Sequence, residues 1–138
     1  MNYLLDANAV IAALKRRPTS VRERLRHALD TGDAVAVSSV VLFELWYGVA
    51  KSQRRQENAE RLRIFLSGQI DVVQFVGDDA PLAGELRAML EASGTSIGPY
   101  DLLSAAQARR TGAVLVTANV SEFSRVPDLV WEDWSVAN

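Results

Sequence analysis

The spacing of apolar residues changes repeatedly along the chain and predicts strands and helices in turn. Short, mainly apolar runs predict strands at 3–5, 34–37, 72–73, 113–116 and, as a last edge strand, 130–131. Apolar residues three or four positions apart predict helices over 6–14, 21–29, 41–49, 59–66 and 82–90, and another beginning at Pro99. Residues 117–123 are expected to form an exit loop. This order is typical of an α/β domain with a mostly parallel central sheet flanked by helices.

Length and composition are those of one globular domain over residues 1–138. Hydrophobic residues make up 49% and charged residues 23%, and there is no cysteine, which excludes disulfides and thiolate metal sites. No run approaches the roughly 18 apolar residues of a membrane span. The first residues lack the features of a secretory signal, so we expect no membrane association and a cytoplasmic location.

Charge is distributed unevenly between the two parts of the chain. Residues 1–63 hold 11 of the 15 Lys and Arg but 7 of the 17 Asp and Glu, a net charge of +4, and residues 64–138 carry −6. This asymmetry favours one surface that attracts phosphate, although the basic clusters at 15–17 and 54–55 could equally be solvated helix ends.

Three acidic residues and one amide lie where parallel strands end. Asp6 directly follows the first strand, and Asn119 lies three residues beyond the strand ending at Val116. Glu44 lies one turn into the helix after the second strand, among apolar neighbours, and Asp101 lies in the first turn of its helix. Because sites in open α/β sheets form at the carboxyl ends of strands, we expect these side chains to converge.

Each acid also has a purely structural explanation. Asp6 could cap the following helix, Asp101 could complement a helix dipole, and Glu44 could pair with an arginine. Acids gathered at one end of a sheet, however, would repel one another and raise their pKa values unless a cation lay among them. Convergence therefore favours a cation site.

The donor set indicates which cation and which chemistry. A cluster of oxygen ligands suits Mg²⁺, or Mn²⁺ as a substitute, rather than zinc. The only histidine, His27, lies on an Arg-rich helix and is expected at the surface, so imidazole chemistry is not predicted. A metal can lower the pKa of its bound water and stabilise a phosphoryl oxygen, which points to phosphodiester hydrolysis.

Four ordered segments contain the candidate site residues and together span nearly the whole chain. They are Tyr3-Leu4-Leu5-Asp6-Ala7-Asn8, the stretch 38–48 around Phe43-Glu44-Leu45, the stretch 97–108 around Tyr100-Asp101-Leu102, and 112–119 ending in Thr117-Ala118-Asn119 and continuing to Pro127. In these segments the sequence resembles the PIN-domain ribonucleases, and among them the VapC toxins of toxin–antitoxin systems.

The resemblance implies a PIN-like three-layer domain, usually a homodimer, with Asp6, Glu44 and Asp101 around Mg²⁺. It implies that Asp6 and Asp101 are direct ligands and that Glu44 holds or activates water. The implied function is a toxin that arrests growth by cutting structured RNA, such as tRNA or rRNA. A VapB-type antitoxin would block the site, and through it the pair would bind operator DNA.

The chain departs from the family where many relatives have a fourth acid, because Asn119 is neutral. We expect Asn119 to act in the site as a carbonyl ligand or by orienting a water, and Glu122 to point elsewhere. With one charge fewer, a single firmly bound Mg²⁺ is predicted. Thr117 could steady the loop through a hydrogen bond or simply end the strand.

Aromatic residues add less. Trp46 and Tyr47 could stack on RNA bases, but on an apolar helix they more often make core or dimer contacts, and Trp131 and Trp134 are expected to anchor the tail. Two other functions fit the sequence less well. An aspartyl phosphatase would need an acid where Asn8 stands. A catalytically weak RNA-binding or regulatory module would have no cause to keep Glu44 among hydrophobic residues.

Overall fold

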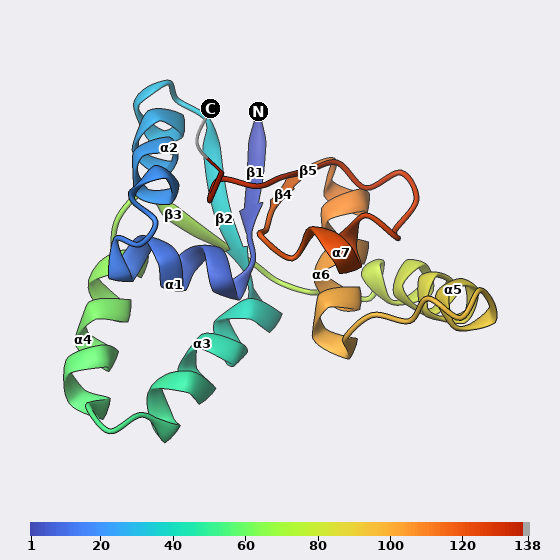
Figure 1. Cartoon of the computed structure of the whole chain (residues 1–138), viewed down its shortest axis with the longest axis horizontal. Helices are drawn as coiled ribbons and strands as arrows, with labels where there is room; N and C mark the ends of the chain where they lie inside the picture. Colours follow the sequence, from blue (N-terminus) through green and yellow to red (C-terminus); the bar gives the residue numbers. More distant parts are fainter. Residues whose placement is uncertain (137–138) are drawn as a thin grey trace.

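Five parallel strands form the centre of the protein in the order β3-β2-β1-β4-β5 (Figure 1). The computed structural model describes residues 1–136. Strand β1 (Asn2–Leu5) lies in the middle, between β2 (Ala34–Ser38) and β4 (Val114–Val116), and the edges are β3 (Ile70–Val73) and β5 (Trp131–Glu132). Because every pairing is parallel, the carboxyl ends of all five strands lie at the same edge of the sheet.

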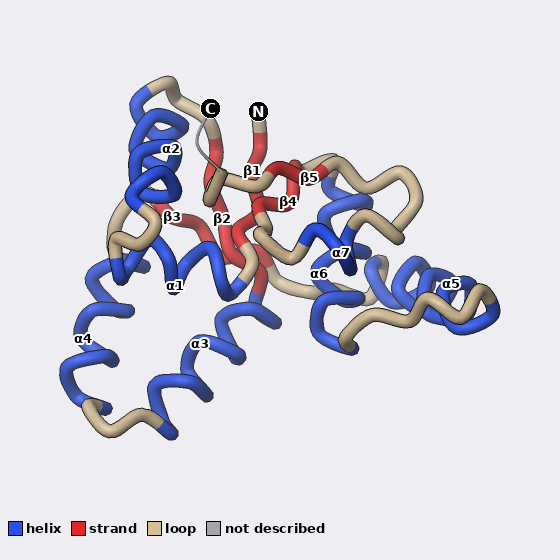
Figure 2. The backbone as a smooth tube through the Cα atoms, viewed as in Figure 1, coloured by secondary structure: helices blue, strands red, loops and turns tan. Residues whose placement is uncertain are grey.

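Helices cover both faces of this sheet (Figure 2). The first core cluster packs one face against α1 (Ala7–Lys15), α2 (Thr19–Asp30), α3 (Ser39–Lys51) and α4 (Arg55–Leu66). The second cluster packs the other face against α5 (Asp79–Ala92), α6 (Pro99–Thr111) and the short α7 (Val120–Phe123). The predicted three-layer α/β architecture is confirmed, with a sheet that is parallel throughout the described residues.

Alternating strand residues supply the two cores. Leu5 belongs to the first cluster and its neighbour Leu4 to the second, and both are buried. Val116 and Leu115 divide in the same way on β4. Side chains that alternate across a strand explain why apolar runs without polar interruption mark strands buried on both faces.

The aromatic residues are arranged mostly as core contacts. Trp134 is buried in the first cluster, and Trp131 packs against the second, which confirms that they anchor the tail. Trp46 packs against the first cluster, whereas Tyr47 is exposed. Within residues 1–136 no helix is long and apolar enough to span a membrane.

Some element boundaries differ from the prediction. The expected exit loop contains helix α7, which is closed by backbone hydrogen bonds and buries Phe123 completely. A single helical turn is too short to show a period in the sequence. Strand β3 begins two residues earlier than expected because exposed Asp71 breaks the apolar run on an edge strand, and β5 pairs through Trp131 and Glu132.

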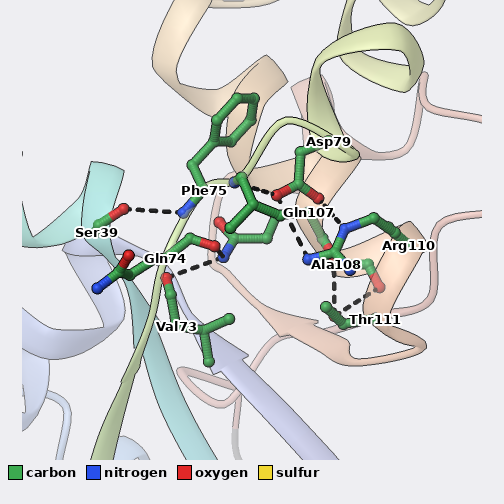
Figure 3. A network of polar contacts seen from close by, with 10 residues as sticks. Ser39, Val73, Gln74, Phe75, Asp79, Gln107, Ala108, Arg110 and Thr111 are labelled. Atoms are coloured by element: carbon green, nitrogen blue, oxygen red, sulfur yellow. Dashed lines mark hydrogen bonds and ion pairs between the residues drawn. The ribbon is translucent and has the colours of Figure 1, made fainter.

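A buried polar network joins α5 and α6 to the end of β3 (Figure 3). The fully buried Asp79 forms an ion pair with Arg110 of α6. The Gln107 side chain, also fully buried, donates from Nε2 to the carbonyl oxygens of Val73 (2.9 Å) and Gln74 (3.2 Å). These contacts fix the second helical layer against the sheet.

Candidate active site

Asp6 ends β1 and begins α1, and it is buried. Its backbone N–H donates to the carbonyl of Val116 (3.0 Å), and its Oδ1 accepts from the N–H of Ala9 (2.8 Å), so it is the N-cap of α1. Burial raises the pKa of the Asp6 carboxyl, while its hydrogen bonds to Thr117 and Ala9 oppose that shift. Asp6 therefore caps α1, as one interpretation of the sequence expected. Its negative charge also raises the pKa values of Glu44 and Asp101.

Thr117 connects the ends of β1 and β4. Its buried hydroxyl accepts from the N–H of Asn119 (2.9 Å) and is hydrogen-bonded to the Asp6 carboxyl, which lowers the pKa of Asp6. The expected loop-steadying hydrogen bond is confirmed. It fixes the start of the 117–123 segment relative to Asp6.

Glu44 is half-buried on α3. Within residues 1–136 it has no ion pair and no hydrogen bond, so the alternative of a partner arginine is not found. Burial raises the pKa of its carboxyl, and the charge of Asp6 raises it further. A Cβ at Gly48, one turn later, would meet no atom within 4 Å, and both residues line a groove of about 250 Å³. Glu44 is thus an unneutralised carboxylate beside open space.

Asp101 lies in the first turn of α6, which begins at Pro99 as expected. A Cβ at Gly98 would come within 3.3 Å of its Oδ2, so the glycine leaves the room that this carboxylate occupies. Burial is the largest cause that raises the pKa of Asp101 to about 7, followed by Glu122 and then by the charges of Glu44 and Asp6. Asp6, Glu44 and Glu122 therefore all lie close enough to Asp101 to raise its pKa.

Glu122 points into the site, so the expectation that it is oriented elsewhere is wrong. Its Oε2 accepts from Nδ2 of Asn119 (2.6 Å) and its Oε1 from the N–H of Gly98 (3.3 Å). A hydrogen bond with Asp101 is the largest cause that lowers the pKa of Glu122. Helix α7 places residues 119 and 122 on one side of a helical turn.

The only sign of Glu122 in the sequence is its position three residues after Asn119. In a helix this spacing brings the two side chains together, but residues 117–123 were expected to form a loop, so the contact was not predicted. Asn119 is close to the acids as predicted, but in this structure its amide holds Glu122. Because Glu122 supplies the fourth negative charge, the reason for expecting only one firmly bound ion no longer stands.

Asp6, Glu44 and Glu122 all raise the pKa of Asp101, but the four carboxylates do not form a closed cage for a cation. In the part of the chain that the structure describes, no three acidic, His or Cys side chains are gathered closely enough to make a ready-made metal site. Mg²⁺ usually keeps several waters and binds through one or two carboxylates, so the all-oxygen donor set at this edge fits it without such a cage. His27 is exposed on α2, as expected.

The fold and the site together define the class of protein. It is a parallel α/β domain with a cluster of unneutralised acids at the carboxyl ends of its strands. The model of the PIN domain matches residues 3–129. The chain belongs to the PIN domain family.

Its curated relatives identify the branch of that family that it resembles. The chain is 41% identical over 134 residues to "Ribonuclease VapC2" of Rickettsia felis, which covers 97% of this chain and 98% of that protein. It is also 41% identical over 135 residues to "tRNA(fMet)-specific endonuclease VapC" of Shigella flexneri, covering 98% and 99%.

Similar solved structures come from the same branch of the family. The fold is similar to that in the VapBC2 complex of Rickettsia felis bound to a promoter DNA fragment, with a TM-score of 0.90, 40% identity, and coverage of 97% of this chain and 99% of that chain. It is also similar to the DNA-bound VapBC of Salmonella typhimurium, with a TM-score of 0.87, 35% identity, and coverage of 97% and 98%. The resemblance to PIN-domain VapC proteins inferred from the four segments is confirmed.

Proposed function

We propose that this protein is a Mg²⁺-dependent endoribonuclease that acts as the toxin of a toxin–antitoxin pair. The observation that carries the proposal is the convergence of four acids at the carboxyl edge of the sheet, where Glu122 accepts from Asn119 and Gly98 and Glu44 lines an open groove. The charges of Asp6, Glu44 and Glu122 all raise the pKa of Asp101, in agreement with this arrangement. Structured RNA is the proposed substrate, with tRNA ahead of rRNA, because relatives at 41% and 37% identity bear the name tRNA(fMet)-specific endonuclease. Cleavage of such RNA would arrest growth.

The acids divide into different roles. Asp6 and Asp101 would hold the ion, since they lie at the end of β1 and the start of α6 and are the most strongly desolvated pair. When bound, Mg²⁺ would supply Lewis-acid stabilisation of the phosphoryl oxygens and ease deprotonation of water. Glu44, with its raised pKa and no partner within residues 1–136, is suited to accept the proton from the attacking water.

Glu122 and Asn119 would hold Asp101 in place and take no direct part in the reaction. Glu122 already accepts two hydrogen bonds, from Asn119 and Gly98, which leaves it suited to orient Asp101. A bound cation would favour the ionised form of Asp101, whose pKa is raised by burial and by Glu122. Asn119 then acts through Glu122, a narrower role than the direct carbonyl ligand expected from the sequence.

The partners follow from the relatives. Similar structures are VapBC complexes, two of them bound to DNA, so we propose a VapB-type antitoxin that blocks the acidic site and through which the pair binds operator DNA. An RNA-cutting toxin restrained by such a partner would act in the cytoplasm. Co-expression with the antitoxin should restore growth.

A homodimer is also proposed. The rings of Phe43 and Tyr100 contact each other at 5.6 Å between centroids, yet both remain exposed, at 53% and 45%, beside exposed Tyr47. Exposed aromatic groups of this kind favour a protein interface. Light scattering of the purified protein should give twice the mass of the 15.1 kDa chain.

Cleavage of total tRNA with and without Mg²⁺ tests the proposal. We expect cleavage with Mg²⁺, none in EDTA, and none for Asp6→Ala or Asp101→Asn. Asp128→Asn is the matched control, because Asp128 is 86% exposed and asparagine tolerates its positive φ of 62°. RNA binding without any cleavage would indicate a regulatory module instead, and cleavage retained by both site variants would refute the assignment of the acids.

A further inference from the structure

A basic hollow of about 620 Å³ lies where the end of α1 meets α2 and α4. Five of the residues that line it are cationic and none is acidic: Lys15, Arg16, Arg17, Arg22 and Arg61. They come from three separate parts of the chain. The attraction of one helix C-terminus for cations therefore does not explain the set, since Arg22 and Arg61 belong to other helices.

The charges of this basic hollow are largely unneutralised. Lys15, Arg16 and Arg17 are exposed, and within residues 1–136 none of them forms an ion pair. Arg22 donates to the carbonyl of Ala13 (3.1 Å), which is not a charged partner. Only Arg61 has a carboxylate, in an exposed pair with Glu57.

Arginines elsewhere in the described chain are used differently. Arg110 pairs with buried Asp79, Arg109 with Asp128, and Arg87 with Glu91. Arg26, Lys51, Arg55 and Arg125 also lack an ion pair within residues 1–136, but they do not line the hollow. The basic hollow is distinguished by gathering five cations, with no acid, in one place.

Arg16 stands at a backbone position that usually favours glycine. It ends α1 with a φ of +57°, and its N–H donates to the carbonyls of Ala12 and Ala13. A glycine would make the same backbone contacts without strain. The arginine side chain adds a guanidinium at the rim of the hollow, and guanidinium groups match phosphate geometry.

The basic hollow leads to the acidic site. It shares Leu14, Lys15 and Arg61 with the groove of about 250 Å³ whose other lining residues include Glu44. Helix α1 runs along this route from its N-cap Asp6 to Lys15, a length of about 14 Å. At about 3.4 Å per nucleotide of a stacked strand, this separation corresponds to roughly four nucleotides.

We propose that the basic hollow binds phosphates of the RNA substrate about four nucleotides from the bond that is cut. The inference rests on the proposed ribonuclease function and adds a substrate-binding subsite to it. Four carboxylates repel an RNA backbone, and the whole chain carries a net charge of −2, so attraction must come from a local basic surface. The basic hollow supplies it without reducing the negative charge that holds the cation.

The double variant Arg16→Asn with Arg17→Gln tests the subsite. Both side chains are exposed, and asparagine tolerates the left-handed backbone of residue 16, so the variant should fold with an unchanged Tm. The matched control is Arg54→Gln with Arg55→Gln, which removes two exposed cations from the α3–α4 turn, outside the hollow. Three quantities are measured for each protein: kcat/KM for tRNA with Mg²⁺, the Kd for the same RNA in EDTA, and inhibition of cleavage by the co-expressed VapB-type antitoxin.

Removal of two phosphate contacts should weaken RNA binding and kcat/KM by about 25-fold at about 0.1 M salt, since each contributes about 0.7 to the log–log salt slope of a single strand. The slope should fall by about 1.4 and kcat should stay unchanged. The control should keep the slope of the unaltered protein.

Three outcomes are informative. If the protein cleaves RNA and both double variants behave alike, the subsite is wrong and the ribonuclease proposal stands. If no protein cleaves RNA but the hollow variant alone loses binding in EDTA, the subsite stands and the catalytic proposal fails. If the hollow variant cleaves RNA normally but escapes its antitoxin, the basic hollow binds an acidic peptide and the RNA proposal is overturned.

Discussion

Asp79 and the acids at the carboxyl edge of the sheet show opposite ways of holding a desolvated carboxylate. Asp79 is fully buried, but it is neutralised by Arg110 and also accepts from the N–H of Val76 (2.8 Å). The acids at the carboxyl edge of the sheet have no cationic partner within residues 1–136. Burial raises the pKa values of Asp6, Glu44 and Asp101, and neighbouring acids of the site raise those of Glu44 and Asp101 further.

The difference separates structure from function. A buried carboxylate with its own guanidinium needs nothing further, and it stabilises the contact between α5 and α6. Carboxylates kept together without a cation lower the stability of the free protein, which is a cost that binding of a metal can offset. Variants of the two kinds of acid should therefore separate loss of activity from loss of stability.

Glu44→Gln should lower kcat by about 1,000-fold, within the range for loss of a general base. The fold should be unaffected, because Glu44 has no ion pair or hydrogen bond within residues 1–136, and Tm should stay the same or rise slightly. Single-turnover cleavage and thermal unfolding of the same preparation measure the two effects. A fall in Tm that parallels the loss of activity would assign Glu44 a structural role instead.

Asp79→Ala should lower stability and leave catalysis nearly unchanged. Removal of this partner leaves Arg110 and the N–H of Val76 unsatisfied, and we expect the free energy of unfolding to fall by about 3 kcal/mol. Below its lowered Tm the variant should cleave RNA with nearly the original kcat. Urea unfolding gives the free energy, with Asp78→Ala as the control on the neighbouring residue. An unchanged free energy of unfolding would remove the contrast on which the comparison depends.

Asn119→Ala should lower kcat/KM by about 10-fold, a typical effect for a residue that orients a ligand. The amide of Asn119 holds Glu122 at 2.6 Å, and Glu122 in turn contacts Asp101. Because the effect passes through metal binding, raising the Mg²⁺ concentration should recover most of the activity. Ser124→Ala, at the exposed end of α7, is the control, because its hydroxyl contacts the carbonyl of Ser121 and not Asn119. An equal loss there would exclude a specific role for Asn119.

Metal-free protein should lose stability as the pH rises from about 4 to about 7. The Asp101 pKa is about 7 in the folded protein against 3.8 ordinarily, so the folded state holds the extra proton. The stabilising contribution is present below about pH 4 and is lost as the pH rises through about 7. The lowered pKa of Glu122 acts only in more acidic solution. Tm measured in EDTA should fall over this interval, and Asp101→Asn should flatten the curve.

Local rules were sufficient for much of this picture. Asp6 follows an apolar run and caps a helix, and Asp101 follows Pro99 in a first helical turn, so both positions could be predicted from neighbouring residues. Parallel topology then predicted that they meet. The three-layer architecture followed from the changing period of apolar residues.

Other features depended on contacts between distant segments. Glu122 acquires its direction from a four-residue helix that leaves no periodic pattern. Asp79 lies in the polar stretch Gly77-Asp78-Asp79, which resembles an exposed helix start, and only packing of α5 on α6 brings Arg110 to it. Local sequence patterns carry no information about such pairings.

Thermal unfolding with increasing Mg²⁺ tests the central claim, that repulsion among the acids creates the demand for a cation. We expect a hundredfold excess of Mg²⁺ over Kd to raise the Tm of the unaltered protein by about 5–10 °C, more at about pH 8 than at about pH 5. We expect almost no rise for Asp101→Asn. An equal rise in both proteins, or none in either, would contradict this claim.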